Sequence, residues 1–151
     1  WYAWAWALLG NREKTAEMVQ LLSPINHGRT QEEIGRYRAE PYAVAADIYT
    51  AQGQQGRGGW SWYTGAAGWM YSLLLEMVLG FHKEGNLLCI RPVVPQEWES
   101  FRMKYSYGSA IYDITVVNKA GKAEPIRLQD DGKTHHITVY VGEQKTRGNQ
   151  E

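Results

Sequence analysis

A change in hydrophobic period divides this 151-residue chain near residues 81–85. Before that point, apolar residues recur at helical spacing, and the segments between them carry capping residues, glycine or proline. After it, short β-branched or aromatic runs alternate with polar residues and are separated by turn sequences. Helices followed by strands predict an α+β fold in which the two kinds of element are segregated.

The individual elements follow from these patterns. Asn11 is the expected N-cap of the second helix, and Gly80 is expected to end the last one. Residues 25–39 are expected to form a loop with a short turn near residues 31–34. The predicted helices cover residues 1–9, 12–22, 41–50 and 64–79, and the predicted strands cover residues 86–90, 101–107, 110–117, 126–128 and 135–141.

Composition argues against several classes of protein. Sixteen basic residues balance sixteen acidic ones, so there is no basic surface of the kind that binds nucleic acid. No apolar run is long enough for a membrane span, so no membrane contact is expected from this segment. The single cysteine, Cys89, lies in an apolar run and is expected to be an inert buried thiol, and no metal-ligand spacing is present.

A glycine-rich aromatic motif, GRGGWSWYTGAAGWMY at residues 56–71, carries the functional signal. Gly58 and Gly59 allow a bend or a close approach of the backbone, and Thr64 stands where a helix N-cap is expected. The free N–H groups of a helix start suit a small anion, while flat aromatic rings suit the apolar faces of a sugar. The motif therefore points to phosphate chemistry on a carbohydrate. The alternative is a buried aromatic core with an ordinary helix cap.

Several motifs together resemble a known family. They are the glycine-rich motif, the preceding YRAEPYAVAADIY, and the later RPVVPQEW and YSYGSAIYDITV. The chain resembles glycoside hydrolase family 94 over residues 1–141. This family includes cellobiose and chitobiose phosphorylases, 1,2-β-oligoglucan phosphorylase and the C-terminal region of cyclic β-1,2-glucan synthase. The resemblance implies that residues 1–82 are the final helices of an (α/α)6 barrel. Residues 83–142 would form an antiparallel β-sandwich of jelly-roll type, followed by a polar tail at residues 143–151.

The resemblance also implies a reaction. Family members break a β-glucosidic bond with inorganic phosphate as co-substrate and without a cofactor, and an Asp acts as the general acid. The family's Thr-Gly pair binds phosphate, which corresponds to Thr64 and Gly65. The general acid and the phosphate-binding arginines of the family lie upstream of this segment. The chain is therefore expected to be a fragment with no catalytic residue of its own and to be inactive alone.

Other side chains are candidates with a less specific signal. Glu40 is a candidate for sugar contact or for capping a helix that begins at Pro41. The aromatic candidates either line a sugar subsite or pack between the barrel and the sandwich. The anion candidates either contact phosphate or are an ordinary solvated arginine and a locally bonded histidine. The full candidate set is Glu40, Tyr42, Trp60, Trp62 and Tyr63 for sugar, and Arg57 and His27 for an anion.

Two other classes of function remain open: a non-catalytic carbohydrate-binding or structural module, and an inverting glucan hydrolase. A hydrolase would need a second carboxylate to activate water, and no residue here is convincingly placed for that role. The runs AVAAD and SPINH favour relatives that act on β-1,2-glucans. The expected partners are a β-glucan oligosaccharide, phosphate and the rest of a parent chain. The isolated segment is expected to self-associate. A cytoplasmic location is expected, with a parent protein tethered to the inner membrane through other domains.

Overall fold

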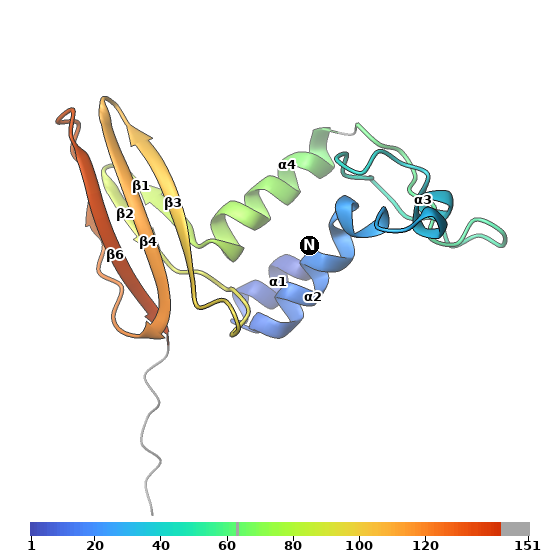
Figure 1. The fold of residues 1–151 in the computed structure, drawn as a ribbon, viewed down its shortest axis with the longest axis horizontal. Coiled ribbons are helices and arrows are strands. Elements are labelled where there is room, and N and C mark those ends of the chain that lie inside the picture. Colours follow the sequence, from blue (N-terminus) through green and yellow to red (C-terminus); the bar gives the residue numbers. More distant parts are fainter. Residues whose placement is uncertain (63, 143–151) are drawn as a thin grey trace, which may run out of the picture. The chain divides into compact units, whose positions relative to one another are not determined.

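The computed structural model describes residues 1–62 and 64–142 and contains helices followed by two small β-sheets (Figure 1). Two compact units divide the chain: the first spans Trp1–Leu75 and the second begins at Glu76. The α+β class predicted from the sequence is confirmed. The assignment of the two regions to a barrel and a sandwich stays a prediction, as do the predicted domain limits. The proposed polar tail lies outside the described residues.

Two helices joined by a tight turn open the first unit: α1 spans Tyr2–Leu8 and α2 spans Arg12–Leu22. The bounds of α2 are those predicted, because its start depends on a local cap: Asn11 Oδ1 accepts from the Lys14 backbone N–H at 3.0 Å. Thr15 is fully buried, and its hydroxyl donates to the Asn11 carbonyl at 2.7 Å, which keeps this polar side chain satisfied inside the helix pair.

The segment expected to be a loop contains two further short helices. A 3-10 turn, η1, spans Pro24–His27, and α3 spans Gln31–Tyr37. A capping box begins α3: the Thr30 hydroxyl accepts from the Glu33 backbone N–H at 3.2 Å, and the Glu33 carboxylate accepts from the Thr30 N–H at 2.9 Å. This Thr-x-x-Glu pattern is visible in the sequence and predicts a helix here, where only a short turn was expected.

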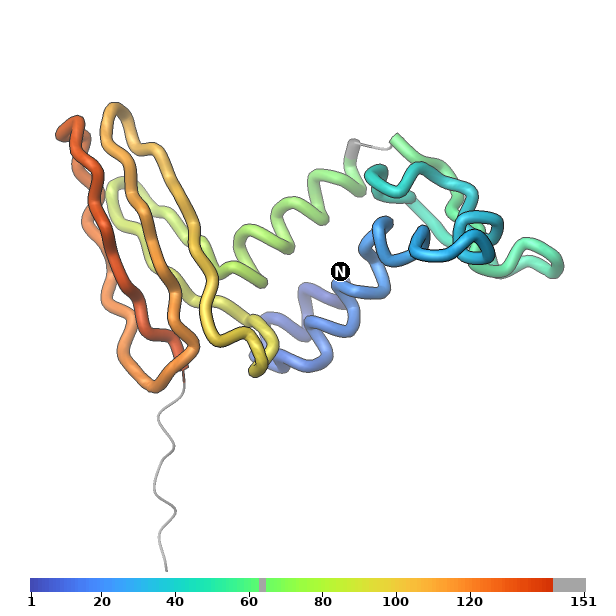
Figure 2. Tube along the Cα trace, in the orientation of Figure 1, coloured from blue at the N-terminus to red at the C-terminus, as the bar shows by residue number. Residues whose placement is uncertain are grey.

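The predicted helix over residues 41–50 is wrong. Residues 46–49 instead form one arm of a hairpin whose other arm is residues 57–60 (Figure 2). The Ala46 N–H donates to the Trp60 carbonyl at 2.8 Å, and the Tyr49 N–H donates to the Arg57 carbonyl at 2.9 Å. The alanine-rich run favours a helix by propensity alone, but pairing with a glycine-containing arm further along the chain satisfies the same backbone groups.

The last helical segment changes type part-way. Helix α4 spans Thr64–Ser72, and the chain continues as a π-helix, η2, over Leu73–Val78, where an unbroken α-helix was expected. The Val93 N–H donates to the carbonyls of Met77 and Val78, each at 3.1 Å, so another segment satisfies the end of the π-helix. Gly80 then adopts a φ of +70°, which ends the helical stretch as predicted.

The second unit contains two three-stranded sheets. One has the order β1-β2-β5 and the other has the order β3-β4-β6. Five strands lie close to their predicted positions, whereas β1 was not predicted because three of its four residues are exposed and polar. The strands are β1 at Phe81–Glu84, β2 at Leu87–Ile90, β3 at Ser100–Tyr107, β4 at Ala110–Ala120, β5 at Ile126–Arg127 and β6 at Thr134–Gly142.

One pairing departs from the all-antiparallel expectation: β6 runs parallel to β4, with Ile114 opposite Ile137. The remaining pairs, β1–β2, β2–β5 and β3–β4, are antiparallel. Strand direction was not readable from alternation, since a half-buried strand has the same period in either direction. A long connection between β4 and β6, which contains β5, allows the parallel arrangement.

Both sheets contribute to one hydrophobic core. Leu88 on β2 and Ile114 on β4 are fully buried in it. Cys89, expected to be buried, is only half-buried because it alternates with Leu88 and Ile90 along the strand. No helix in residues 1–62 and 64–142 is long and apolar enough to cross a bilayer. The core consists of Leu88, Ile90, Ala110, Tyr112, Ile114, Val116, Leu128 and Val139.

Candidate functional site

The glycines of the motif allow the hairpin arms to approach each other. A Cβ atom at Gly59 would overlap the Asp47 carboxylate, and the Gly59 N–H donates to the Asp47 backbone carbonyl at 2.8 Å. The Gly58 N–H donates to the Tyr37 carbonyl at 2.7 Å. Asp47 also accepts from the Trp60 N–H at 3.1 Å. The close approach expected at Gly58 and Gly59 is therefore to this chain's own backbone and to Asp47.

Two of the sugar candidates contact each other directly. The indole N–H of Trp62 donates to Glu40 Oε1 at 3.1 Å, across a sequence separation of 22 residues. Tyr42 lies edge-on to Trp62, with 6.1 Å between ring centroids and an interplanar angle of 72°. Trp62 adopts a φ of +62°, a conformation that is uncommon for a bulky residue and marks a tightly specified turn.

The aromatic candidates are exposed. We name Tyr42, Trp60 and Trp62 the aromatic platform; their exposed fractions are 71%, 73% and 70%. Isolated exposed aromatics are common on protein surfaces, but these three lie within one loop region and offer flat apolar faces and polar edges. Within the described residues, these rings do not belong to a hydrophobic core, so burial in this chain does not explain them.

Glu40 does not cap a helix, because no helix begins at Pro41. Its pKa lies below the ordinary value, chiefly because its own backbone N–H donates to the carboxylate, with the Trp62 indole and Ser61 side chain adding to the effect. The side chain is thus held as a carboxylate at neutral pH. It can accept hydrogen bonds from hydroxyl groups but is not prepared to donate a proton. Glu40 and Asp47 do not lie on a common helix.

The phosphate candidates lie at the start of α4. The helix begins at Thr64 itself, so Thr64 is the first helical residue and not the N-cap. Its side chain and Tyr63 lie outside the described residues, so these two predictions stay open. Gly65 is exposed, and the first-turn N–H groups of an α-helix have no partner within the helix. The backbone at this point is therefore suited to an acceptor such as an oxyanion.

His27 makes local contacts. Its Nε2 atom donates to the Leu21 carbonyl at 2.7 Å, and its ring stacks on Tyr37 with 4.9 Å between centroids. Burial raises the pKa of the Tyr37 phenol, which is therefore a neutral stacking partner at pH 7. These contacts fit the interpretation of His27 as a histidine with local hydrogen bonds. Its assignment as an anion contact stays a prediction.

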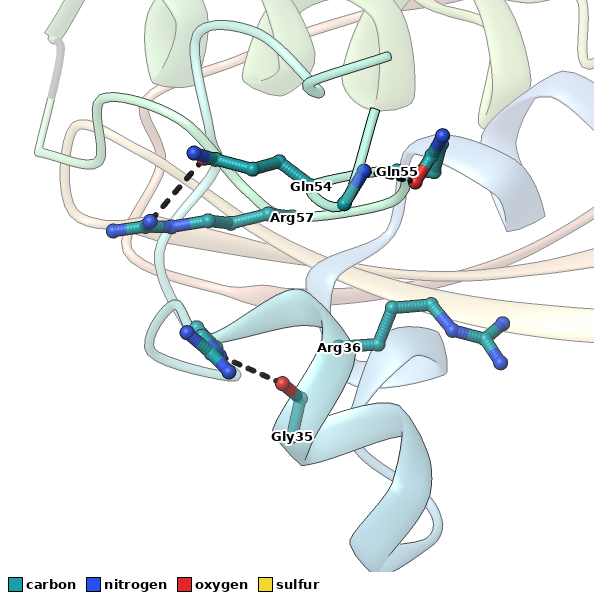
Figure 3. A pocket seen from close by; sticks show the side chains of 7 residues that line it. Gly35, Arg36, Gln54, Gln55 and Arg57 are labelled. Atoms are coloured by element: carbon teal, nitrogen blue, oxygen red, sulfur yellow. Dashed lines mark hydrogen bonds between the residues drawn. The ribbon is translucent and has the colours of Figure 1, made fainter. Parts of the chain in front are cut away.

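Arg57 lines a surface depression of about 260 Å³ (Figure 3). One of its terminal nitrogens, Nη1, donates to Gln54 Oε1 at 3.3 Å, and its guanidinium lies 5.9 Å from the centre of the Tyr49 ring. Sequence reasoning missed Arg38, which lines the same depression. No local signal marks it: an arginine after a helix is common, and only the fold brings residues 35–38 and 53–57 together.

The described residues near the motif provide groups for binding, while their two carboxylates, Glu40 and Asp47, already hold other groups of the chain. Glu40 is engaged with Trp62, and Asp47 is engaged with the hairpin backbone. No cluster of metal-ligating side chains occurs in the part of the chain that the structure describes. What remains is a set of aromatic faces, one carboxylate acceptor, an exposed helix start and an arginine-lined depression. These groups suit a polyhydroxylated ligand that carries, or is accompanied by, an anion.

Comparison with known proteins agrees with this arrangement. Residues 1–80 match the family described as the glycosyl hydrolase 94 superfamily, catalytic domain. The chain belongs to this superfamily. The match ends where the helical stretch ends at Gly80, and it includes the platform and the start of α4. The resemblance stated from the motifs is thereby confirmed.

Relatives of known function extend the likeness. The chain is 39% identical over 126 residues to the cyclic beta-(1,2)-glucan synthase NdvB of Rhizobium meliloti. This alignment covers 83% of this chain and 4% of that protein. It is 35% identical to the solabiose phosphorylase of Paenibacillus borealis, over 62% of this chain and 12% of the relative. It is 29% identical to the N,N'-diacetylchitobiose phosphorylase of Vibrio proteolyticus, over 76% of this chain and 14% of the relative. The chain thus spans a small part of each relative.

Proposed function

We propose that this chain is part of a glycoside phosphorylase-like protein that acts on β-glucans with inorganic phosphate, and that it contributes one wall of the phosphate site. The observation that carries the proposal is the superfamily match over residues 1–80. Two of the relatives are phosphorylases by name, and the first is a cyclic β-(1,2)-glucan synthase, which supports a β-1,2-glucan as the substrate.

In this proposal, Thr64 and Gly65 bind phosphate. The start of α4 supports the assignment, since N–H groups without helical partners and the positive end of the helix dipole both favour an oxyanion. A glycine at the second helical position leaves the approach to these amides clear of a side chain. The threonine hydroxyl adds one further donor in the assembled site.

The aromatic platform and Glu40 are proposed to contact the sugar. Rings exposed by about 70% can stack on a pyranose face, and the Glu40 carboxylate can accept from sugar hydroxyls. Its lowered pKa fits a binding role and not that of the general acid. The general acid is proposed to come from another part of the parent protein, so the chain alone is expected to be inactive. No cofactor is proposed.

The first unit is proposed to be the end of an (α/α)6 barrel, and the second unit a jelly-roll-like sandwich. Support for missing helices comes from the helix pair: Leu9 and Leu21 are exposed by 75% and 57%, and Trp6 Nε1 is buried without an acceptor among the described residues. A buried N–H without a partner is costly, so a neighbouring element of the parent chain is proposed to supply one. A cytoplasmic location is part of the same proposal.

The decisive experiment changes the hydroxyl in the full-length parent. Thr64→Val keeps the β-branched shape and removes one donor, so the KM for phosphate is expected to rise at least about ten-fold while the sugar KM changes little. Thr138→Val, on an exposed strand position, is the matched control and is expected to leave both constants unchanged. An unaltered phosphate KM in Thr64→Val would refute the assignment.

A non-catalytic carbohydrate-binding module is the second candidate, and the exposure of the aromatic platform favours it. The two candidates differ in their need for phosphate. In the phosphorylase, glucan cleavage by the parent requires phosphate and yields a sugar phosphate. In the binding module, the parent binds glucan through the platform whether or not phosphate is present, and no sugar phosphate is formed.

A further inference from the structure

A depression in the first unit has an unusual chemical lining. Three arginines, two glutamines and two glycines line it, and no acidic residue is among them. Two stretches of chain form it: the end of α3 with the residue that follows, and the tip of the hairpin. None of the lining residues belongs to α4, so the depression does not depend on the phosphate site proposed at Thr64 and Gly65.

The three arginines are not equivalent. The Arg36 guanidinium donates to Glu32 Oε1 at 2.6 Å, and its aliphatic stem packs against Gly56. Figure 3 shows the ends of the Arg36 and Arg57 side chains directed to opposite sides. Arg36 therefore has its counter-charge and serves to support the hairpin.

Arg38 and Arg57 are the cations of this lining without a carboxylate partner. Arg38 is held in a left-handed conformation, φ +54°, and its Nε donates to the Gly35 carbonyl at 2.8 Å. Arg57 donates to the neutral side chain of Gln54. Across the described residues, neither guanidinium forms an ion pair. Each keeps several N–H donors for another acceptor.

The glutamines reinforce this donor character. The Gln54 side-chain oxygen already accepts from Arg57, and the Gln55 side-chain oxygen accepts from the Gly53 N–H at 3.0 Å. Their amide NH₂ groups remain as donors. A depression that offers guanidinium and amide N–H groups, with its side-chain oxygens already used, matches a ligand rich in acceptor oxygens and negative charge.

The volume of the depression limits the size of the ligand that it can hold. A volume of about 260 Å³ is several times that of a water molecule and lies just below the usual range for pockets that enclose drug-sized molecules. Bare inorganic phosphate would leave most of this space to solvent, whereas one sugar ring bearing a charged group would fill it. The choice of a sugar as the body of the ligand rests on the proposed function.

We propose that Arg38 and Arg57 bind the oxyanion of a monosaccharide-sized anionic sugar, a sugar phosphate or a sugar acid, in a site separate from Thr64 and Gly65. The two guanidiniums hold the phosphate or carboxylate oxygens through charge-assisted hydrogen bonds. The Gln54 and Gln55 amides donate to ring or hydroxyl oxygens. Arg57 was already an anion candidate from the sequence, whereas Arg38 was identified only because the fold places it in the same depression.

The test measures binding to the present chain by calorimetry with four probes: α-glucose 1-phosphate, glucuronate, glucose and inorganic phosphate. At least one of the two anionic sugars is expected to bind more tightly than glucose and more tightly than phosphate. The stronger of the two identifies phosphate ester or carboxylate as the group bound. Failure of both anionic sugars to bind, or equal binding of glucose, would overturn the proposal.

Variants locate the ligand. Arg57→Gln removes one charge, and Arg38→Asn removes the other while keeping a residue that tolerates a positive φ. Each is expected to weaken binding of the anionic sugar at least about ten-fold. Arg29→Gln removes an exposed arginine outside the depression and is expected to have no effect. The proposal is overturned if Arg29→Gln weakens binding as much as the two site variants do.

A last variant separates this inference from the proposed function. Thr64→Val is expected to leave binding of the anionic sugar to the depression unchanged. If Thr64→Val abolishes that binding while Arg38→Asn and Arg57→Gln do not, the sugar anion occupies the start of α4. The inference would then be wrong and the phosphate assignment would stand.

Discussion

Among the single residues of the motif, Gly59 is a position where only glycine fits. Gly59 lies against the Asp47 carboxylate, which also accepts from the Trp60 N–H, so one acidic side chain holds the hairpin arm that carries Trp60. The acid lies in a run whose composition favours a helix and gives no local sign of this role. Gly68, in the middle of α4, has open space where a Cβ atom would lie and is not constrained in this way.

A pair of alanine substitutions tests this difference. Gly59→Ala is expected to lower the free energy of unfolding by about 1–3 kcal/mol, because the new Cβ must displace Asp47 and break its bond to Trp60. Gly68→Ala is expected to be neutral or to stabilise by up to about 1 kcal/mol, since alanine favours helix. Urea unfolding followed by circular dichroism measures both. Equal effects from the two substitutions would contradict the role assigned to Asp47.

At the scale of elements, a buried acid lies at the centre of the β3-β4-β6 sheet. Asp113 on β4 has an exposed side-chain fraction of 5%, and it pairs with Arg102 on β3 and with His136 on β6, the latter at 3.3 Å. The pKa of Asp113 lies below its ordinary value, chiefly because the Arg102 guanidinium donates to it. One charged residue therefore connects all three strands on the face opposite Ile114.

The sign of the resulting pH dependence follows from linkage. Because the folded pKa is lower than the unfolded one, the stabilisation by Asp113 is complete above its ordinary pKa of 3.8 and is lost as the pH falls through the folded value. The stability difference between the wild-type chain and Asp113→Asn is expected to shrink as the pH falls from about 5 through 3.8 and below. Urea unfolding at a series of pH values measures it.

The matched control is Glu124→Gln, which disrupts an exposed pair with Lys122. Exposed ion pairs contribute little to stability, so the free energy of unfolding of this variant is expected to equal that of the wild-type chain at every pH. A constant difference between wild type and Asp113→Asn across the whole pH range would show that the Arg102–Asp113 pair does not carry the effect.

At the scale of the whole molecule, the exposed apolar side chains are the dominant feature. Trp1, Leu8 and Leu9 are exposed by 86%, 70% and 75%, which is unusual for apolar residues that recur on neighbouring turns. Burial of such side chains contributes about 25 cal/mol per Å². The isolated chain is therefore expected to associate with itself through the helix pair.

Sedimentation velocity over a range of concentrations checks this expectation. The wild-type chain is expected to form dimers or larger species, and Leu8→Lys combined with Leu22→Lys is expected to shift it towards monomer. Thr138→Lys adds the same kind of charge at an exposed strand position and is expected to leave the association unchanged. A wild-type chain that is monomeric at every concentration would rule out self-association.

The sequence alone determined those features that depend on near neighbours. The bounds of α2 follow from the Asn11 cap and its apolar stripe, and the end of the helical stretch follows from Gly80. Five of the strands followed from alternation and turn residues, and the superfamily followed from the glycine-rich motif together with the other family motifs. In each case the sequence signal lies in residues that are close together along the chain.

Features that depend on distant contacts could not be predicted from local sequence patterns. Residues 46–49 are paired in a hairpin, not helical, because their partners are residues 57–60. The parallel direction of β6 and the Glu40–Trp62 hydrogen bond are of the same kind. So is the placement of Arg38 and Arg57 in the lining of one depression. Differences in helix propensity between residues are worth less free energy than a set of paired backbone hydrogen bonds together with a buried contact. Tertiary contacts therefore override local propensity wherever they favour a different structure.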